Sequence, residues 1–134
     1  MSSSNNKDGK TSIQHIHQGS GHVIRQAQPS DFEGIMEIEN ACFPGELAYS
    51  REQMRYLVFK ANGITLVETT DDQLRGYITM VFRRNSDMAS LETIGVLPSC
   101  RGCGAGGRLL KAAEEWMATK GITWFRLEVS AGND

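Results

Sequence analysis

The chain has 134 residues, of which 40% are hydrophobic and 22% are charged, and its formal net charge is −2. These values predict one globular domain. The absence of a basic patch or a Lys/Arg run argues against binding to nucleic acid or to a membrane surface. The apolar runs are too short to cross a bilayer, and no secretory signal is expected. The odd number of cysteines, three, favours a reducing, cytoplasmic compartment.

Residues 1–22 are rich in Ser, Asn, Gln and Gly and contain few apolar side chains. Such a segment cannot offset the entropy lost on ordering, so we expect a disordered tail here and a folded domain over residues 23–134. His15 and His17 have no acidic or cysteine ligands nearby, which favours solvated side chains over a metal site.

The sequence of the first half of the domain predicts a strand and two helices. Residues 23–27 form the expected strand, and a helix then runs to about residue 41 with Ser30 as its N-cap. The second helix follows the cap Ser50 and ends near Gly63, where a further strand begins.

The second half predicts four strands and one helix. The expected strands comprise residues 64–68, 77–82, 90–96 and 123–129. Asp71 and Asp72 form a hairpin turn, and residues 83–87 are polar and turn-like. The helix spans about residues 106–120 and ends at Gly121.

This order, β-α-α-β-β-β-α-β, predicts an α/β fold with a mixed sheet and helices on both faces. The strands at residues 90–96 and 123–129 are joined through a helix, so we expect them to be parallel. The earlier strands are expected to be antiparallel. The strand at residues 77–82 is almost entirely apolar, which is typical of a central strand that is covered on both faces.

Residues 91–110, LETIGVLPSCRGCGAGGRLL, predict an apolar strand ending at Val96, a short loop and a helix. The loop contains four glycines within six residues, namely Gly102, Gly104, Gly106 and Gly107. Glycine allows close approach of the backbone to a ligand, and a helix beginning here directs free N–H groups and its positive dipole end at the loop. Together with Arg101, the pattern predicts a site for phosphate or pyrophosphate.

Two other interpretations of this loop are less favoured. Its G-x-G-x-x-G spacing, followed by Glu128, is also that of a dinucleotide-binding oxidoreductase, but too little chain follows for the remaining sheet of that fold. Cys100 and Cys103 form a CxxC pair, yet no downstream proline supports a thioredoxin-like site, and few further ligands are available for zinc. We expect the cysteines to be incidental and no metal to be bound.

The same stretch resembles the acetyl-CoA loop of the GNAT superfamily of N-acetyltransferases, V-x-P followed by R/Q-x-x-G-x-G/A. The matching residues are Val96, Pro98, Arg101, Gly104 and Gly106. The resemblance extends from about residue 23 to residue 134 and is greatest to the branch that acetylates ribosomal-protein alanine and protein N-termini. It implies the GNAT fold, acetyl-CoA as cosubstrate and residues 43–50 as a wall of the acceptor site.

The resemblance also implies roles for individual residues. The cofactor-binding residues would be Ile94, Val96, Arg101, Gly102, Cys103, Gly104, Ala105, Gly106, Gly107 and Asn133. Glu128 matches a glutamate that serves as general base in this branch, and Glu92 is a second candidate because some members use a carboxylate on that strand. The base would take a proton from the attacking ammonium.

GNAT proteins continue with another helix and two strands, so the resemblance implies a domain that is truncated at its C-terminus. The family's general-acid tyrosine would lie in the missing part. An uncovered last strand invites pairing with another chain, so we expect self-association as a homodimer, or else marginal stability.

The predicted function is direct transfer of acetyl from acetyl-CoA to a primary amine of a protein N-terminus, a lysine or a small molecule. The alternative is a truncated, non-catalytic domain that binds acyl-CoA or a protein partner.

Overall fold

The computed structural model describes residues 17–19, 21–82, 88–122 and 124–127. These residues form one six-stranded sheet in the order β1-β2-β3-β4-β5-β6, with three α-helices. The strands are β1 His17–Gly19, β2 His22–Gln26, β3 Gly63–Thr70, β4 Gln73–Phe82, β5 Met88–Val96 and β6 Trp124–Leu127. The helices are α1 Phe32–Cys42, α2 Arg51–Phe59 and α3 Ala105–Thr119.

The predicted mixed topology is confirmed. Strands β1 to β5 pair in antiparallel fashion, whereas β6 pairs with β5 in parallel after the crossover through α3. The predicted turn at residues 83–87 and the end of the predicted last strand lie outside the described residues. Pairing between two chains through that strand stays a prediction. No helix in the described ranges is long and apolar enough to cross a membrane.

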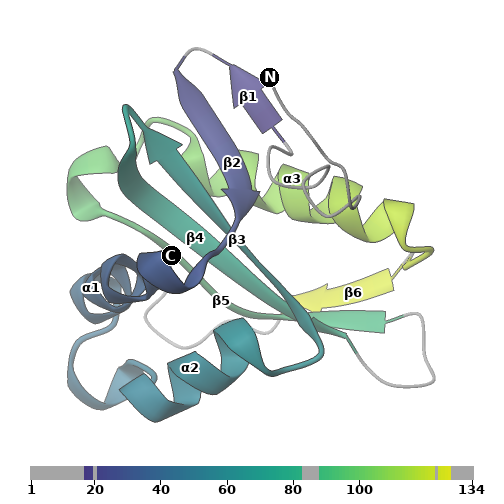
Figure 1. Cartoon of the computed structure of the whole chain (residues 1–134), viewed down its shortest axis with the longest axis horizontal. Coiled ribbons are helices and arrows are strands. Elements are labelled where there is room, and N and C mark those ends of the chain that lie inside the picture. The colour runs from purple at the N-terminus through teal and green to yellow at the C-terminus, as the bar shows by residue number, and fades with distance from the viewer. Residues whose placement is uncertain (1–16, 20, 83–87, 123, 128–134) are drawn as a thin grey trace.

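Helices α1 and α2 lie on one face of the sheet, and α3 lies on the other (Figure 1). Two apolar cores result. Tyr77 of β4 is buried among residues of α1 and α2, while its neighbour Ile78 is buried with Leu109 of α3. Because successive side chains of a strand point to opposite faces, β4 contributes to both cores, as predicted for a strand that is covered on both sides.

The sheet begins earlier in the chain than predicted from the sequence. His17 and His22 belong to strands, and β1 pairs with β2 through partners such as His17 and Ile24, although residues 1–22 were predicted to be a tail. Backbone hydrogen bonds to a neighbouring strand stabilise such a segment. These bonds do not depend on side-chain type, so amino-acid composition does not predict them. The prediction for residues 1–16 falls outside the described part of the chain.

The predicted cap of the first helix is wrong. Ser30 lies inside a 3-10 turn, Pro29–Asp31, and α1 begins immediately after it. The carboxylate of Asp31 accepts the backbone N–H of Gln28 at 2.7 Å and two hydrogen bonds from Arg25 at 2.8 and 3.0 Å. Asp31, anchored by Arg25, therefore fixes the entry to the helix in place of Ser30.

The predicted start of the second helix and the predicted end of the third are confirmed, whereas the second helix ends earlier than predicted, at Phe59 instead of near Gly63, which is the first residue of β3. The Ser50 hydroxyl accepts the N–H of Gln53 at 3.1 Å, and the Gln53 side chain accepts the N–H of Ser50 at 2.9 Å, which is a capping box. Helix α3 ends at Thr119 with Lys120 as its C-cap. Gly121 follows, and its φ of 78° allows its N–H to bond the carbonyl of Ala118 at 3.1 Å.

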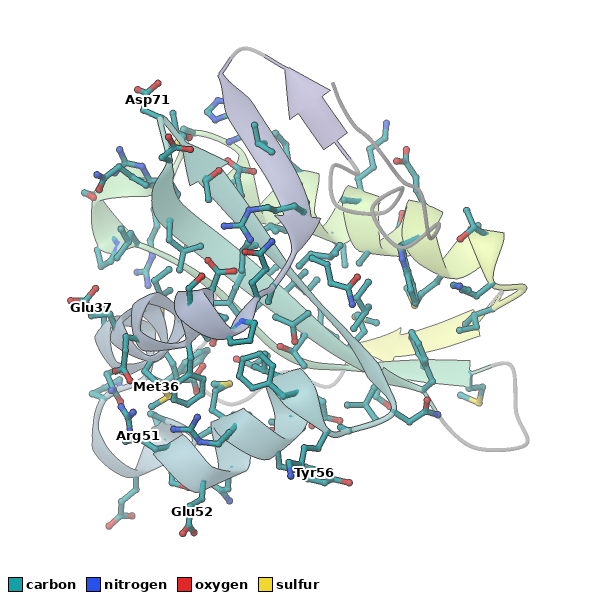
Figure 2. All side chains as sticks on the ribbon, viewed as in Figure 1. Met36, Glu37, Arg51, Glu52, Tyr56 and Asp71 are labelled. Carbon is teal, nitrogen blue, oxygen red and sulfur yellow. The ribbon has the colours of Figure 1, made fainter. Side chains whose placement is uncertain are left out.

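The β3–β4 hairpin turns through Asp71 and Asp72, which have φ values of 53° and 65°. Asp71 lies at the tip of this hairpin, away from the cores (Figure 2). We expect Asp71→Gly to maintain or raise the free energy of unfolding, since glycine adopts this conformation without steric cost.

Asp71→Val is the matched comparison, and we expect it to lower the free energy of unfolding by about 1–2 kcal/mol, because aspartate tolerates the left-handed conformation whereas a β-branched residue does not. Urea unfolding of both variants measures the difference. Equal stability of the two would contradict the turn geometry.

Candidate functional site

A cavity of about 450 Å³ lies where β5 ends and α3 begins. Its lining consists of Cys42, Ile94, Gly95, Val96, Cys100, Arg101, Gly102, Gly104, Ala105 and Gly106. The structure therefore brings the end of the strand and most of the predicted glycine loop around one space. Among the other predicted residues, Cys103 and Gly107 do not line this cavity, and Asn133 lies outside the described residues.

Cys42 is a lining residue that no pattern in the sequence indicates. It is the last residue of α1, and its thiol donates a hydrogen bond to the carbonyl of Val96 at 3.3 Å. The contact joins positions that are 54 residues apart, so no local pattern in the sequence indicates it.

The glycines of the loop serve two purposes. Gly102 and Gly104 both have a φ of 86°, a conformation that strains other residues. Gly106 needs no unusual conformation, and a Cβ there would find its nearest heavy atom, on Val96, only at 4.0 Å. The protein itself does not require glycine at position 106, which fits close approach of a ligand to the first turn of α3.

The first turn of α3 supplies the electrostatic character of the cavity. Gly104 is the N-cap and provides no side-chain cap, so the first N–H groups of the helix are available to an external acceptor. The guanidinium of Arg101 donates to the Val96 carbonyl at 3.3 Å and to Cys42 Sγ at 3.2 Å. These acceptors are weak compared with a phosphate oxygen, and the whole arrangement suits an anion.

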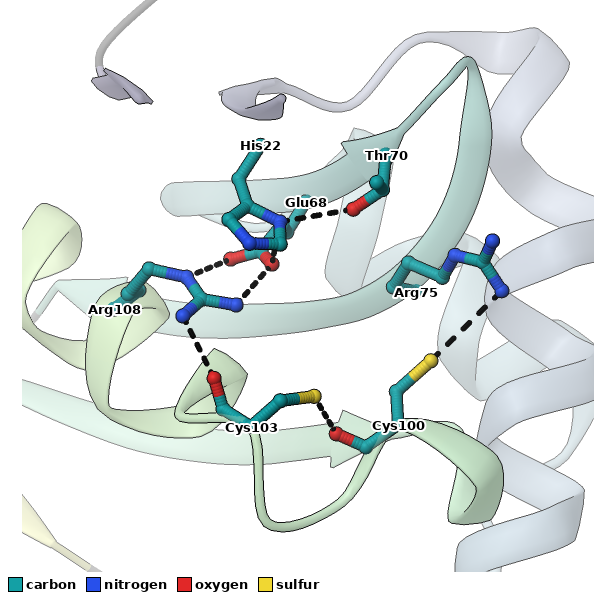
Figure 3. Close-up of polar contacts among 7 residues, drawn as sticks. All are labelled: His22, Glu68, Thr70, Arg75, Cys100, Cys103 and Arg108. Carbon is teal, nitrogen blue, oxygen red and sulfur yellow. Dashed lines mark hydrogen bonds and ion pairs between the residues drawn. The ribbon is translucent and has the colours of Figure 1, made fainter. Parts of the chain in front are cut away.

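The back of the loop is held by an ion pair between α3 and β3 (Figure 3). Arg108 donates to both carboxylate oxygens of Glu68, at 3.1 and 2.7 Å, and to the carbonyl of Cys103 at 2.8 Å. Glu68 is 1% exposed, and its hydrogen bond raises the pKa of Arg108. His22 adds a contact to Glu68 at 3.5 Å. One arginine thus ties the helix, the loop and the sheet together.

The two cysteines of the CxxC pair lie on this side of the loop and are free thiols. Cys103 Sγ contacts the carbonyl of Cys100, and Arg75 lies 3.8 Å from the sulfur of Cys100 (Figure 3). Within the described ranges, no group of three or more His, Cys, Asp or Glu side chains is placed to hold a metal ion.

Glu92 lies at an irregularity of the sheet. Thr79 pairs with Thr93 and Met80 pairs with Leu91, which leaves Glu92 as an extra residue of β5 without a partner on β4. Such bulges redirect a side chain.

Glu92 lines a second cavity of about 680 Å³ beside the end of α2. The other lining residues are Tyr56, Leu57, Lys60, Ala61, Asn62, Val81 and Phe82. Ile94, which lines the first cavity, lies two residues further along β5, about 7 Å on an extended strand, so one strand contributes to both cavities.

Tyr49 connects the loop between α1 and α2 to Glu92. Its hydroxyl donates to the Glu92 carboxylate at 3.2 Å, and its N–H donates to Glu39 at 3.0 Å. Burial, followed by the charge of Glu92, raises the pKa of Tyr49 to about 12, so the phenol keeps its proton and remains a donor. The other predicted base, Glu128, lies outside the described residues.

The model of the acetyltransferase (GNAT) family matches residues 32–134. No curated protein matches the chain. Among solved structures, the ribosomal-protein-S18-alanine N-acetyltransferase of Escherichia coli has a TM-score of 0.74 at 20% identity, covering 84% of this chain and 69% of that one.

Two further structures show the same fold. Ard1 from Thermoplasma volcanium has a TM-score of 0.71 at 21% identity, covering 85% of this chain and 75% of its own. A GNAT family acetyltransferase from Brucella melitensis, solved in complex with acetyl-CoA, has a TM-score of 0.65 at 22% identity, covering 84% of this chain and 76% of its own. The fold expected from the resemblance is confirmed.

We expect Glu68→Gln to lower the free energy of unfolding by about 1.5–3 kcal/mol, the usual value of a hydrogen bond to a charged group, because the amide offers Arg108 only one acceptor. Glu33→Gln is the matched control, since Glu33 also forms a two-pronged pair, with Arg51, but on the exposed surface. It should change stability little. Urea unfolding measures the free energy of unfolding of both variants. An equal decrease in both would show that the buried pair of Glu68 contributes no more to stability than the exposed pair of Glu33.

Proposed function

Since the chain belongs to the GNAT acetyltransferase family, we propose that it transfers acetyl from acetyl-CoA directly to a primary amine. The observation that carries this proposal is the cavity between the end of β5 and the first turn of α3, whose lining includes Val96, Arg101, Gly104, Ala105 and Gly106. The Brucella melitensis neighbour of this fold was solved with acetyl-CoA, which supports the same donor here.

The residues of the cavity fit the chemical groups of acetyl-CoA. The N–H groups of the loop from Gly102 to Gly107, with the positive end of α3 and the charge of Arg101, would hold the pyrophosphate. Cys103, although it does not line the cavity, would contribute through its backbone. Ile94 and Val96 would offer backbone groups to the pantetheine arm, and Asn133 stays a proposed binding residue. Each hydrogen bond to a charged oxygen contributes about 1.5–3 kcal/mol.

We place the acceptor amine in the second cavity, beside Glu92. The carboxylate of Glu92 attracts a cationic amine, while Tyr56 is 58% exposed and projects outward from α2 near the cavity that it lines (Figure 2). Neighbours in fold act on very different amines, since one is a ribosomal-protein alanine acetyltransferase and another an aminoglycoside N-acetyltransferase. A protein N-terminus, a lysine and a small amine therefore all stay within the proposed acceptor class.

The chemistry requires a proton acceptor. Acetyl-CoA supplies an activated thioester, but an ammonium has no lone pair with which to attack it, so a general base contributes about 10²–10⁴-fold in rate. Glu128 and Glu92 are the proposed bases. The hydrogen bond from Tyr49 to Glu92 holds in place the carboxylate that would accept the proton.

The binding part of the proposal is tested by calorimetric titration with acetyl-CoA, with NADH as the control ligand. We expect saturable binding of acetyl-CoA alone. Arg101→Glu should weaken it by roughly 10- to 100-fold, since it replaces a charge-assisted hydrogen bond with repulsion. Lys111→Glu reverses an exposed charge on α3 away from the cavity and should leave the affinity unchanged. Equal affinities of the two variants would remove Arg101 from the site.

The catalytic part is tested by the release of CoA thiol in the presence of amine acceptors. Two variants are compared, Glu92→Gln and Glu128→Gln. The one that removes the general base should lose about 10²–10⁴-fold in kcat and retain its affinity for acetyl-CoA. Wild-type rates in both variants would exclude both residues as the base. Binding of acetyl-CoA without any transfer by the wild-type chain would favour the alternative of a non-catalytic acyl-CoA-binding domain.

A further inference from the structure

Glu39 is a buried carboxylate to which the proposed chemistry assigns no role. It lies in the last turns of α1, on the face that packs against the sheet, and is 1% exposed. No ion pair joins it to a cation in the part of the chain that the structure describes. Burying a carboxylate is costly unless hydrogen bonds compensate for the lost water, so its partners indicate what it does.

Three hydrogen bonds from three different elements converge on Glu39. One carboxylate oxygen accepts from the hydroxyl of Tyr77 on β4 and from that of Thr93 on β5 at 3.0 Å. The other accepts the backbone N–H of Tyr49, in the loop before α2, at 3.0 Å. Tyr77 is 0% and Thr93 3% exposed. Glu39 therefore fastens the α1–α2 loop to the two central strands.

Both ends of this network reach Glu92. Thr93 is its neighbour in the bulged part of β5, and the hydroxyl of Tyr49 donates to the Glu92 carboxylate at 3.2 Å. As the extra residue of the bulge, Glu92 has no partner on β4 that fixes its direction. The hydrogen bond from Tyr49 orients it, and the position of Tyr49 depends in turn on Glu39.

We infer that Glu39 is a positioning residue, which holds Tyr49 so that its phenol directs the Glu92 carboxylate into the acceptor cavity. The inference rests on the proposed acetyl transfer and assigns Glu39 to the acceptor side of the reaction alone. The three partners of its carboxylate, Tyr49, Tyr77 and Thr93, are not among the residues that line the proposed acetyl-CoA cavity, so donor binding should be independent of it.

The test compares Glu39→Gln, Tyr49→Phe and the double variant. The amide introduced by Glu39→Gln retains one accepting oxygen but sets an NH₂ group against one of the donors, while Tyr49→Phe removes only the hydroxyl that holds Glu92. Glu37→Gln is the control, because Glu37 is an exposed carboxylate on the same helix (Figure 2). The assay measures acetyl transfer to a mixture of short peptides with free α-amines and lysines, beside the affinity for acetyl-CoA.

We expect both single variants to lose about 10- to 100-fold in kcat/KM for the peptides, as a misplacement of about 1 Å can cause, with unchanged affinity for acetyl-CoA. The double variant should be no worse than the poorer single variant, since both changes act through one contact. Glu37→Gln should match the wild type.

Wild-type transfer by Glu39→Gln, losses that multiply in the double variant, or a parallel loss of acetyl-CoA affinity would each overturn the inference. Should Glu39→Gln not fold, Tyr49→Phe decides, because wild-type transfer by that variant would show that nothing depends on the orientation of Glu92. If the wild-type chain binds acetyl-CoA but transfers to no amine, the proposed function fails together with this inference. If the wild-type chain transfers acetyl and only the Glu39 and Tyr49 variants lose transfer, the result bears on the positioning role of Glu39 and leaves the proposed function intact.

Discussion

The pair between Arg108 and Glu68 is the contact on which the candidate site depends. A loop made largely of glycine presents its backbone freely but has few side chains with which to fix its own shape. The shape is imposed from behind, where Arg108 binds the buried Glu68 with two hydrogen bonds and the carbonyl of Cys103 with a third. The sheet thereby determines where the first turn of α3 directs its N–H groups.

Strand β5 gives the site its second constraint. Its last residues, from Ile94 to Val96, line the cavity beside the glycine loop, while the bulge at Glu92 turns a carboxylate toward a separate cavity. In the proposed reaction, the donor and the acceptor would therefore approach the same strand from different cavities. Sites that are carried on strands and helices keep their geometry better than sites on loops, and Glu92 depends on a loop only through its contact with Tyr49.

Local sequence patterns predicted the features that depend on near neighbours. The glycine loop, the cap Ser50 and the apolar β4 each followed from residues within a few positions, and the structure has all three. The pattern at Ser30 wrongly predicted the N-cap of α1, because the ion pair with Arg25 places Asp31 at that position instead. Cys42 could not be predicted, since its contact with the end of β5 joins positions 54 residues apart. Glu92 was predicted as a candidate base through the resemblance, but its direction depends on a bulge, and the hydrogen bonds of Glu39 join distant elements, so no local pattern indicates either arrangement.

The position of β4 between two cores links the stability of the whole fold to the binding of any ligand. Tyr77 and Ile78 are both 0% exposed and belong to opposite cores, so loss of either core exposes the strand that supports the other. We therefore expect the chain to unfold cooperatively, as small single domains usually do. Any ligand that binds only the folded chain stabilises it as a whole by mass action. Occupancy of the glycine loop would consequently protect even α2, on the far face of the sheet, from proteases that cleave unfolded chains.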